Sequence, residues 1–210
     1  MIPRRCLGRP PSTELGEPIT DGIPRIPGFI AGTWQLDPAH SDVGFVVGHL
    51  VVSKVHGRFD AFSGTVVTDE NLARTSVSVS IEAASVNTHL PVRDNQVRSA
   101  DFLDAEHFPN ITFVSTAVRE ESGQYFVDGD LTIRGTTRPV TLDLTVNGFS
   151  PDTFGANRAS FSATTTIDRN DFGVSFNAPI PGLNHAMLLS DSVSINLDVE
   201  AVLQTGSAAS

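Results

Sequence analysis

The sequence predicts an all-β fold, a closed antiparallel barrel of about eight strands with one helical insert at about residues 87–108. Apolar and polar residues alternate in eight or nine segments between positions 32 and 203. Such alternation is typical of antiparallel strands with one dry and one wet face. Short glycine-containing breaks join neighbouring segments as hairpins. A sandwich would also suit these strands, but closing the sheet removes its exposed edges.

The strands expected before the insert cover residues 32–36, 42–50, 55–67 and 76–82. In the second of them Val43, Phe45, Val47 and His49 share one face. The third is long, and its glycines are expected to mark bends or bulges. The fourth alternates without exception, which favours a strand with one buried face.

The insert is the only region with a helical pattern. Asn87 or Thr88 can cap it, and Pro91 suits its first turn. Asp101 can begin a second short turn, and Pro109 returns the chain to an extended conformation.

The strands expected after the insert cover residues 110–119, 124–133, 140–149, 158–168 and 190–203. The second and third form a hairpin around the break "RGTTRP", residues 134–139. The last strand is long, and one of its faces carries Val193, Ile195, Leu197, Val199 and Ala201.

Composition excludes several classes of partner. The net charge of −10 argues against nucleic acid, which requires a basic face, and against docking on anionic lipid. No segment approaches the length of a membrane-spanning helix, so no integral membrane segment is expected. The basic start "MIPRRCLG" lacks the apolar run of a signal peptide, so we expect a cytoplasmic protein. Cys6, the single cysteine, is expected to be a free thiol in a tail.

The chain divides into three parts. Residues 1–30 hold six of the 13 prolines without periodicity and are expected to form an irregular arm. Residues 31–204 form the barrel. Residues 205–210 form a small polar, flexible C-terminal tail.

The central question is whether the barrel interior is filled or hollow. Thirteen phenylalanines accompany one tryptophan and one tyrosine, and small residues such as Ala159 and Ala163 lie between the large ones. An interior of this kind can line a greasy tunnel. It can equally be a core packed at ordinary density.

Four motifs in the chain resemble those of the YceI-like family, the polyisoprenoid-binding, lipocalin-like proteins. The first is "WQLDPAHSDVGFVVGHLVVSKVHGRFDAFSGTV", which carries Asp-x-x-His-Ser and Gly-x-Phe-x-x-Phe-x-Gly. The others are "VRDNQVRSADFLDAEHFPNITFVST", "GDLTIRGTTRPVTL" and "RNDFGVSFN". Together they span residues 32 to about 203, in the family's order.

The resemblance implies an extended lipocalin-like barrel that holds a long isoprenoid chain as carrier or store, often as a homodimer. A polyprenyl pyrophosphate or an isoprenoid quinone is the expected guest, and no other cofactor is required. The apolar tunnel wall is expected to comprise Phe45, Val47, Phe59, Val79, Ile81, Phe102, Phe108, Phe113, Leu131, Leu144, Phe161 and Ile195.

Three polar residues are candidates for contact with a head group. His49 shares a face with Phe45, and Arg93 and Arg98 of the insert can meet a pyrophosphate. Each can instead be structural, as a satisfied core histidine or a pair of solvated or salt-bridged arginines. Arg169 in "RNDFG" is expected to lock a turn.

Catalysis and metal binding find little support. Asp37, His40 and Ser41 are triad residue types, but proximity in sequence gives no triad geometry, and Asp37 and Ser41 can simply close a turn. The six histidines have no ligand spacing, so no metal is expected. A fatty acid or fatty amide binder is the main alternative, and an isoprenoid-modifying enzyme is a further one.

Overall fold

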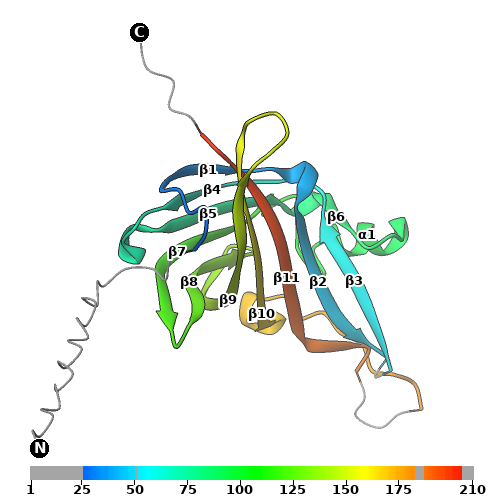
Figure 1. Cartoon of the computed structure of the whole chain (residues 1–210). Coiled ribbons are helices and arrows are strands. Elements are labelled where there is room, and N and C mark those ends of the chain that lie inside the picture. Colours follow the sequence, from blue (N-terminus) through cyan, green and yellow to red (C-terminus); the bar gives the residue numbers. More distant parts are fainter. Residues whose placement is uncertain (1–25, 51, 183–186, 205–210) are drawn as a thin grey trace, which may run out of the picture.

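The chain folds into a closed barrel (Figure 1), as predicted. The computed structural model describes residues 26–50, 52–182 and 187–204. Eight strands form the ring in the order β1-β4-β5-β7-β8-β9-β10-β11, and β1 pairs with β11 to close it through Trp34 opposite Leu203. Their bounds are β1 Gly32–Leu36, β4 Phe62–Thr68, β5 Ser76–Glu82, β7 Asn110–Glu121, β8 Gln124–Ile133, β9 Thr136–Pro151, β10 Asn157–Asp168 and β11 Leu189–Leu203.

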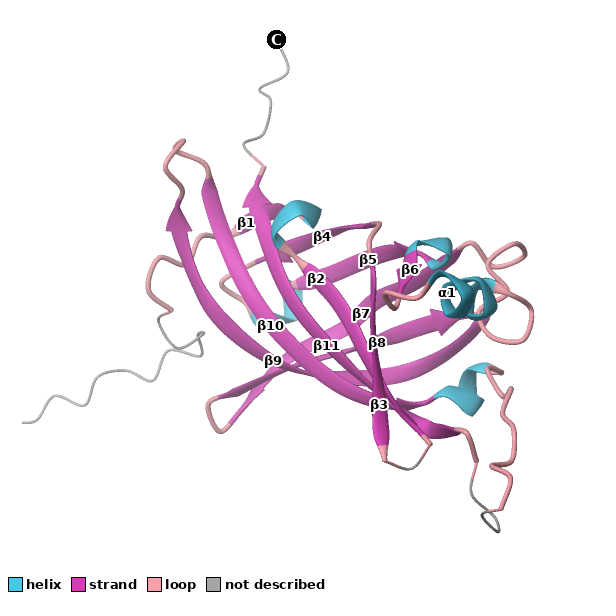
Figure 2. Cartoon of the chain, turned by 90° about the vertical axis from the view of Figure 1, so that its right-hand side faces the viewer, coloured by secondary structure: helices cyan, strands magenta, loops and turns pink. Residues whose placement is uncertain are grey.

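Three further strands extend the wall beside β11. They are β2 (Asp42–His49), β3 (Ser53–Phe59) and β6 (Val86–Asn87), in the order β11-β2-β3-β6. Strand β11 supports both neighbours because it is long: residues 201–203 pair with β1 and residues 189–198 pair with β2. The extension continues the barrel towards the helical insert (Figure 2).

Two predicted strand boundaries are wrong. The single strand expected over residues 55–67 is β3 and β4, which are separated at Asp60 and Ala61. The strands separate because β3 pairs with β2 and β6, whereas β4 pairs with β1 and β5. The hairpin between β8 and β9 is also tighter than expected. Arg134 and Gly135 both have positive φ, 50° and 69°, so the turn needs two residues and β9 begins at Thr136.

The insert contains one α-helix, α1 (Pro91–Arg98), with Pro91 in the first turn as predicted. Its N-cap residue is Leu90, without a side-chain cap, in place of Asn87 or Thr88. The chain also contains the 3-10 turns η1 (Pro38–His40), η2 (Leu72–Arg74), η3 (Ala83–Ser85) and η4 (Arg169–Phe172). Within the described ranges, no helix is long and apolar enough to cross a bilayer.

The end of the expected N-terminal arm packs on the barrel. The Phe29 ring meets the Phe149 ring edge-on at 5.4 Å, and Ile30 packs beside Trp34. Cys6 and the C-terminal tail lie outside the described residues.

An ionic cluster ties η1 to the ends of β9, β10 and β11. The Arg158 guanidinium contacts the carboxylates of Asp37 at 2.7 Å, Asp152 at 3.1 Å and Glu200 at 3.1 Å. Asp37 also accepts the amide of Ala39, which closes the "DPAHS" turn. The bond from Arg158, followed by that from His40, lowers the pKa of Asp37 below its ordinary value of 3.8.

We expect this cluster to make stability depend on pH in the acid range. Because the pKa of Asp37 is lower in the folded state, its contribution is complete above the unfolded value of 3.8 and is lost below it. Thermal melts from about pH 6 to pH 2.5 should therefore show Asp37→Asn less stable than the wild type at the upper end. The difference should shrink as the pH falls. A difference that stays constant with pH would contradict this role.

Candidate binding cavity

The barrel encloses a cavity of about 420 Å³ whose walls are almost entirely apolar. Inward-facing residues of the ring strands and of β2 and β3 form the wall, so the alternation in the sequence selects the cavity side of each strand. The predicted inward face of β11 lines it through Val193, Ile195, Leu197 and Val199. The interior is therefore hollow and is not filled by its own side chains.

Eleven of the twelve residues predicted for the tunnel wall line the cavity. They are Phe45, Val47, Phe59, Val79, Ile81, Phe102, Phe113, Leu131, Leu144, Phe161 and Ile195. The exception is Phe108, whose ring lies against the backbone of Gly135 at the turn between β8 and β9. Phe108 therefore does not line the cavity, because the loop after α1 carries it to that turn.

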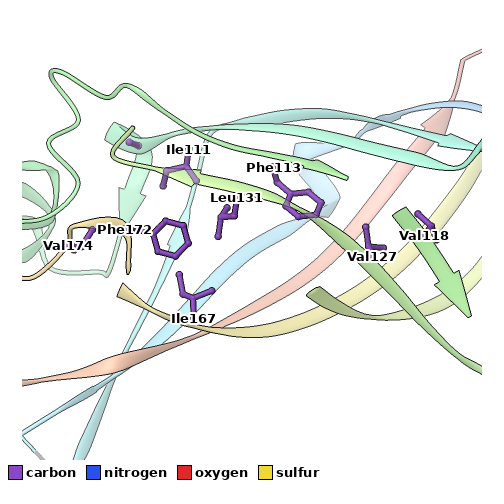
Figure 3. Packing of buried hydrophobic residues seen from close by; sticks show 9 residues of the cluster. Ile111, Phe113, Val118, Val127, Leu131, Ile167, Phe172 and Val174 are labelled. Atoms are coloured by element: carbon purple, nitrogen blue, oxygen red, sulfur yellow. The ribbon is translucent and has the colours of Figure 1, made fainter. Parts of the chain in front are cut away.

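One end of the cavity lies at the insert and η4. Figure 3 shows the Phe172 ring between Ile111 and Ile167, next to Leu131. Phe172 is 2% exposed. Phe102 of the insert and Phe176 lie nearby, with their ring centroids 5.2 Å apart. The prediction did not include Phe172 or Phe176, because they lie in irregular segments without periodicity.

Arg169, the first residue of η4, supports this end of the cavity. It is 5% exposed and donates to the carbonyl oxygens of Val174 at 2.6 Å, Phe176 at 2.9 Å and Ser190 at 2.9 Å. It also contacts the carboxylate of Asp191 at 3.0 Å. These bonds confirm the predicted turn lock.

An aromatic cluster lies at the other end of the barrel. Phe149 packs against Trp34 and Phe161 with centroid distances of 5.5 Å and 5.9 Å. The Trp34 indole is fully buried and donates to the Thr68 hydroxyl at 2.8 Å. The cluster makes this end rigid and apolar.

Of the two predicted arginines, only Arg93 lines the cavity. Its guanidinium donates to the Thr88 hydroxyl and carbonyl, each at 2.7 Å. Thr88 in turn donates its amide to the buried carboxylate of Asp94 at 2.8 Å. Burial tends to raise the pKa of Asp94, but the bonds from Thr88 and the charges of Arg98 and Arg93 outweigh it, so the pKa is lowered. Asp94 therefore stays ionised and fixes the segment that holds Arg93.

Arg98 has a structural environment. It donates to the carbonyl oxygens of Ala84 at 2.6 Å and Val86 at 2.8 Å, and so fastens α1 to η3 and β6. Its placement contradicts the expected position at the cavity, since the side chain leaves α1 on the side of these backbone carbonyls. The predicted alternative of a structural arginine applies.

His49 lines the cavity with Phe45, as its position on β2 predicts. Its Nδ1 lies 3.4 Å from the Ser53 hydroxyl. Asp37, His40 and Ser41, the residues of triad type, form a turn: the Ser41 hydroxyl donates to the carbonyl oxygen of Asp37 at 2.8 Å. This bond closes the turn, whereas a nucleophile would direct its hydroxyl to His40.

Comparison with known proteins gives consistent matches. The sequence profile of the YceI-like domain matches residues 34–201. A UPF0312 protein of Pseudomonas putida (strain W619) is 39% identical over 180 residues, 83% of this chain and 88% of that protein. BcnA of Burkholderia cenocepacia has a TM-score of 0.67 at 28% identity, covering 79% of this chain and 98% of that one.

The fold is also similar to that of a more distant solved structure. A polyisoprenoid binding domain from Saccharophagus degradans, implicated in plant cell wall breakdown, has a TM-score of 0.62. The identity is 16%, and the match covers 83% of this chain and all of that domain, 100%. At this identity, the match concerns the fold alone.

Proposed function

Because the chain belongs to the YceI-like family, we propose that its barrel binds a long-chain isoprenoid lipid and acts as its carrier or store. The guest is a polyprenyl pyrophosphate or an isoprenoid quinone. The observation that carries this proposal is the hollow apolar interior of about 420 Å³. The choice of an isoprenoid rests on the family to which the chain belongs, and the distant polyisoprenoid binding domain supports the fold alone.

The energetics of such binding rest on apolar burial. A prenyl tail offers only methyl groups and double bonds, so its affinity comes from apolar area removed from water, at roughly 25 cal/mol per Å². Ordering the tail and losing its overall motion offset much of this gain. A preformed cavity with rigid ends such as the Trp34 cluster lowers the cost, because the protein does not have to reorganise.

Arg93, in the insert, and His49, at the end of β2 opposite Ser53, are the polar groups proposed to meet a charged head group. Arg93 lines the cavity, and Thr88 holds its guanidinium in place. A guanidinium can donate two parallel hydrogen bonds to a pyrophosphate. No catalytic step is proposed, and no cofactor other than the lipid itself is required.

The proposal is tested by identifying what the purified protein holds. Native mass spectrometry followed by organic extraction is expected to give bound masses that differ in C5 units. Straight-chain masses would instead identify a fatty acid or fatty amide binder, and would contradict the isoprenoid assignment. Protein that contains no lipid and does not take up a prenyl quinone or a polyprenyl pyrophosphate would contradict lipid binding altogether. Conversion of the added lipid, lost in His49→Ala, would indicate an enzyme.

A further inference from the structure

One polar group inside the cavity has no hydrogen-bond partner among the residues that the structure describes. Tyr125, the only tyrosine of the chain, lies on β8 and lines the cavity. Its hydroxyl oxygen is buried, and no described residue forms a hydrogen bond with it. It is the one buried side-chain nitrogen or oxygen in the described part of the chain that is left without a partner.

The barrel register explains why Tyr125 points inward. β8 pairs Tyr125 with Leu144 of β9, and Val127 with Leu142, and all four residues line the cavity. On the other side, a register shift in β7 between Ser115 and Ala117 turns Val118 inward opposite Val127. These aliphatic neighbours cannot accept a hydrogen bond. Glu120 lies directly opposite Tyr125 on β7, but its carboxylate accepts from the Gly123 amide and forms no hydrogen bond with the Tyr125 hydroxyl.

Such a hydroxyl is unfavourable to bury alone, since an unmade hydrogen bond in an apolar site costs free energy. Buried polar groups in folded proteins nearly always have a partner, so an exception calls for one that the protein chain does not supply. Burial, and then the charge of Glu120, raise the pKa of Tyr125, so the hydroxyl is protonated at neutral pH and can donate.

Tyr125 also lies far from Arg93, the arginine of the insert that lines the cavity. The opposite end of β8 is Ile133, and the next residue, Arg134, donates to the carbonyl oxygen of Phe102 in the insert at 3.2 Å. Eight residues of extended strand separate Tyr125 from Ile133, which corresponds to about 27 Å. The cavity therefore has a cationic group at one end and a neutral donor near the other.

We propose that the Tyr125 hydroxyl donates a hydrogen bond to a carbonyl oxygen of the hydrophobic guest and so selects oxygenated prenyl lipids, of the quinone class, over plain hydrocarbons. The guest lies with its oxygenated ring near Tyr125 and its tail directed towards the insert. This inference rests on the proposed function, because it specifies the guest of the same cavity. A carbonyl fits because it accepts without donating and is neutral, so entering an apolar cavity removes little solvation from it compared with a charged group.

A matched pair of probes tests the assignment: a prenyl naphthoquinone, and the prenyl naphthalene that has the same tail but no oxygens. Binding of each is measured by titration of the wild type and of Tyr125→Phe, which keeps the ring and removes the hydroxyl. The quinone should bind about tenfold more weakly to Tyr125→Phe, because one hydrogen bond is lost. The naphthalene should bind Tyr125→Phe as tightly as it binds the wild type, or more tightly.

Infrared spectroscopy provides a second readout that a merely structural role would not change. In the wild type, the carbonyl stretch of the bound quinone should lie at lower frequency than in Tyr125→Phe. Tyr125→Phe should also melt at or above the temperature of the ligand-free wild type, since it removes an unpaired buried group.

Each outcome decides a specific question. Equal quinone affinity and equal carbonyl frequency in both variants would overturn the role of Tyr125 and leave the proposed function standing. Failure of both probes to bind the wild type would overturn the proposed function as well. A preference of the wild type for the naphthalene would also contradict the inference.

Discussion

Replacing Ala163 with phenylalanine is expected to abolish guest binding while the barrel stays folded. Ala163 lies in the middle of β10, is 7% exposed and lines the cavity. Its neighbours in the sheet are Leu144 of β9 and Leu197 of β11, which line the cavity as well. A benzyl group at this position enters the cavity and occupies volume that a guest requires.

The expected loss of affinity is large because the substitution removes most of the apolar area that a guest can bury at this level of the barrel. We expect affinity for a prenyl quinone to fall on the order of a hundredfold. Ligand-free stability should be unchanged or higher, because the new ring is buried in space that is already present. Binding is measured by titration, and stability by thermal melting.

The matched control is Thr166→Phe on the same strand, which places the same ring on the exposed outer face. It should bind the quinone as the wild type does. Unchanged binding in Ala163→Phe would mean that the guest does not occupy the interior. A strongly destabilised Ala163→Phe would mean that the interior has no room.

Replacing Arg169 with methionine is expected to cause the largest loss of stability among the variants considered. Three backbone carbonyl oxygens, those of Val174, Phe176 and Ser190, accept from its guanidinium at 2.6–2.9 Å. Methionine retains part of the apolar volume but leaves these buried and half-buried acceptors without the guanidinium that pairs them. We expect a loss of about 3 kcal/mol, or about 10 °C in melting temperature for a chain of this size.

The control is Arg138→Met on β9, where the side chain is exposed and, among the described residues, bonds only to the neighbouring carbonyl oxygen of Thr137. It should change the melting temperature by less than about 2 °C. If both variants melt alike, Arg169 does not hold η4 and the start of β11 together. Because Arg169 also lines the cavity, its replacement should weaken binding of the prenyl quinone.

Period-two alternation predicted the parts of the fold in which one face of a strand is dry. The inward positions of β2, β8 and β11 follow from it directly. It did not predict the break at Asp60, where the inward positions change from Val55 and Phe59 on β3 to Val66 and Thr68 on β4, because Gly57 and Gly64 were interpreted as bends or bulges of one strand. Nor did it predict the two-residue turn at Arg134, where an arginine adopts a positive φ that its type rarely favours.

In the candidate site, too, residues on regular strands could be predicted and residues in loops and short turns could not. Wall residues on regular strands were predicted from periodicity, whereas Phe172 and Phe176 were missed in irregular segments. In the insert, Phe108 and Arg98 were expected at the cavity and lie elsewhere, because their directions depend on loop geometry that short apolar runs do not encode. Tyr125 could have been found: it precedes Val127 and Leu131 with the same period, and its hydroxyl stands out on an apolar face.

The account depends on a hydrophobic guest that occupies the barrel interior. The most direct measurement is a crystal structure grown with a polyprenyl chain brominated near its tail. We expect the anomalous bromine signal inside the barrel, within contact distance of wall residues such as Phe113, Ala163 and Ile195. Bromine bound only to the outer surface, with the interior unchanged and empty of lipid, would contradict it.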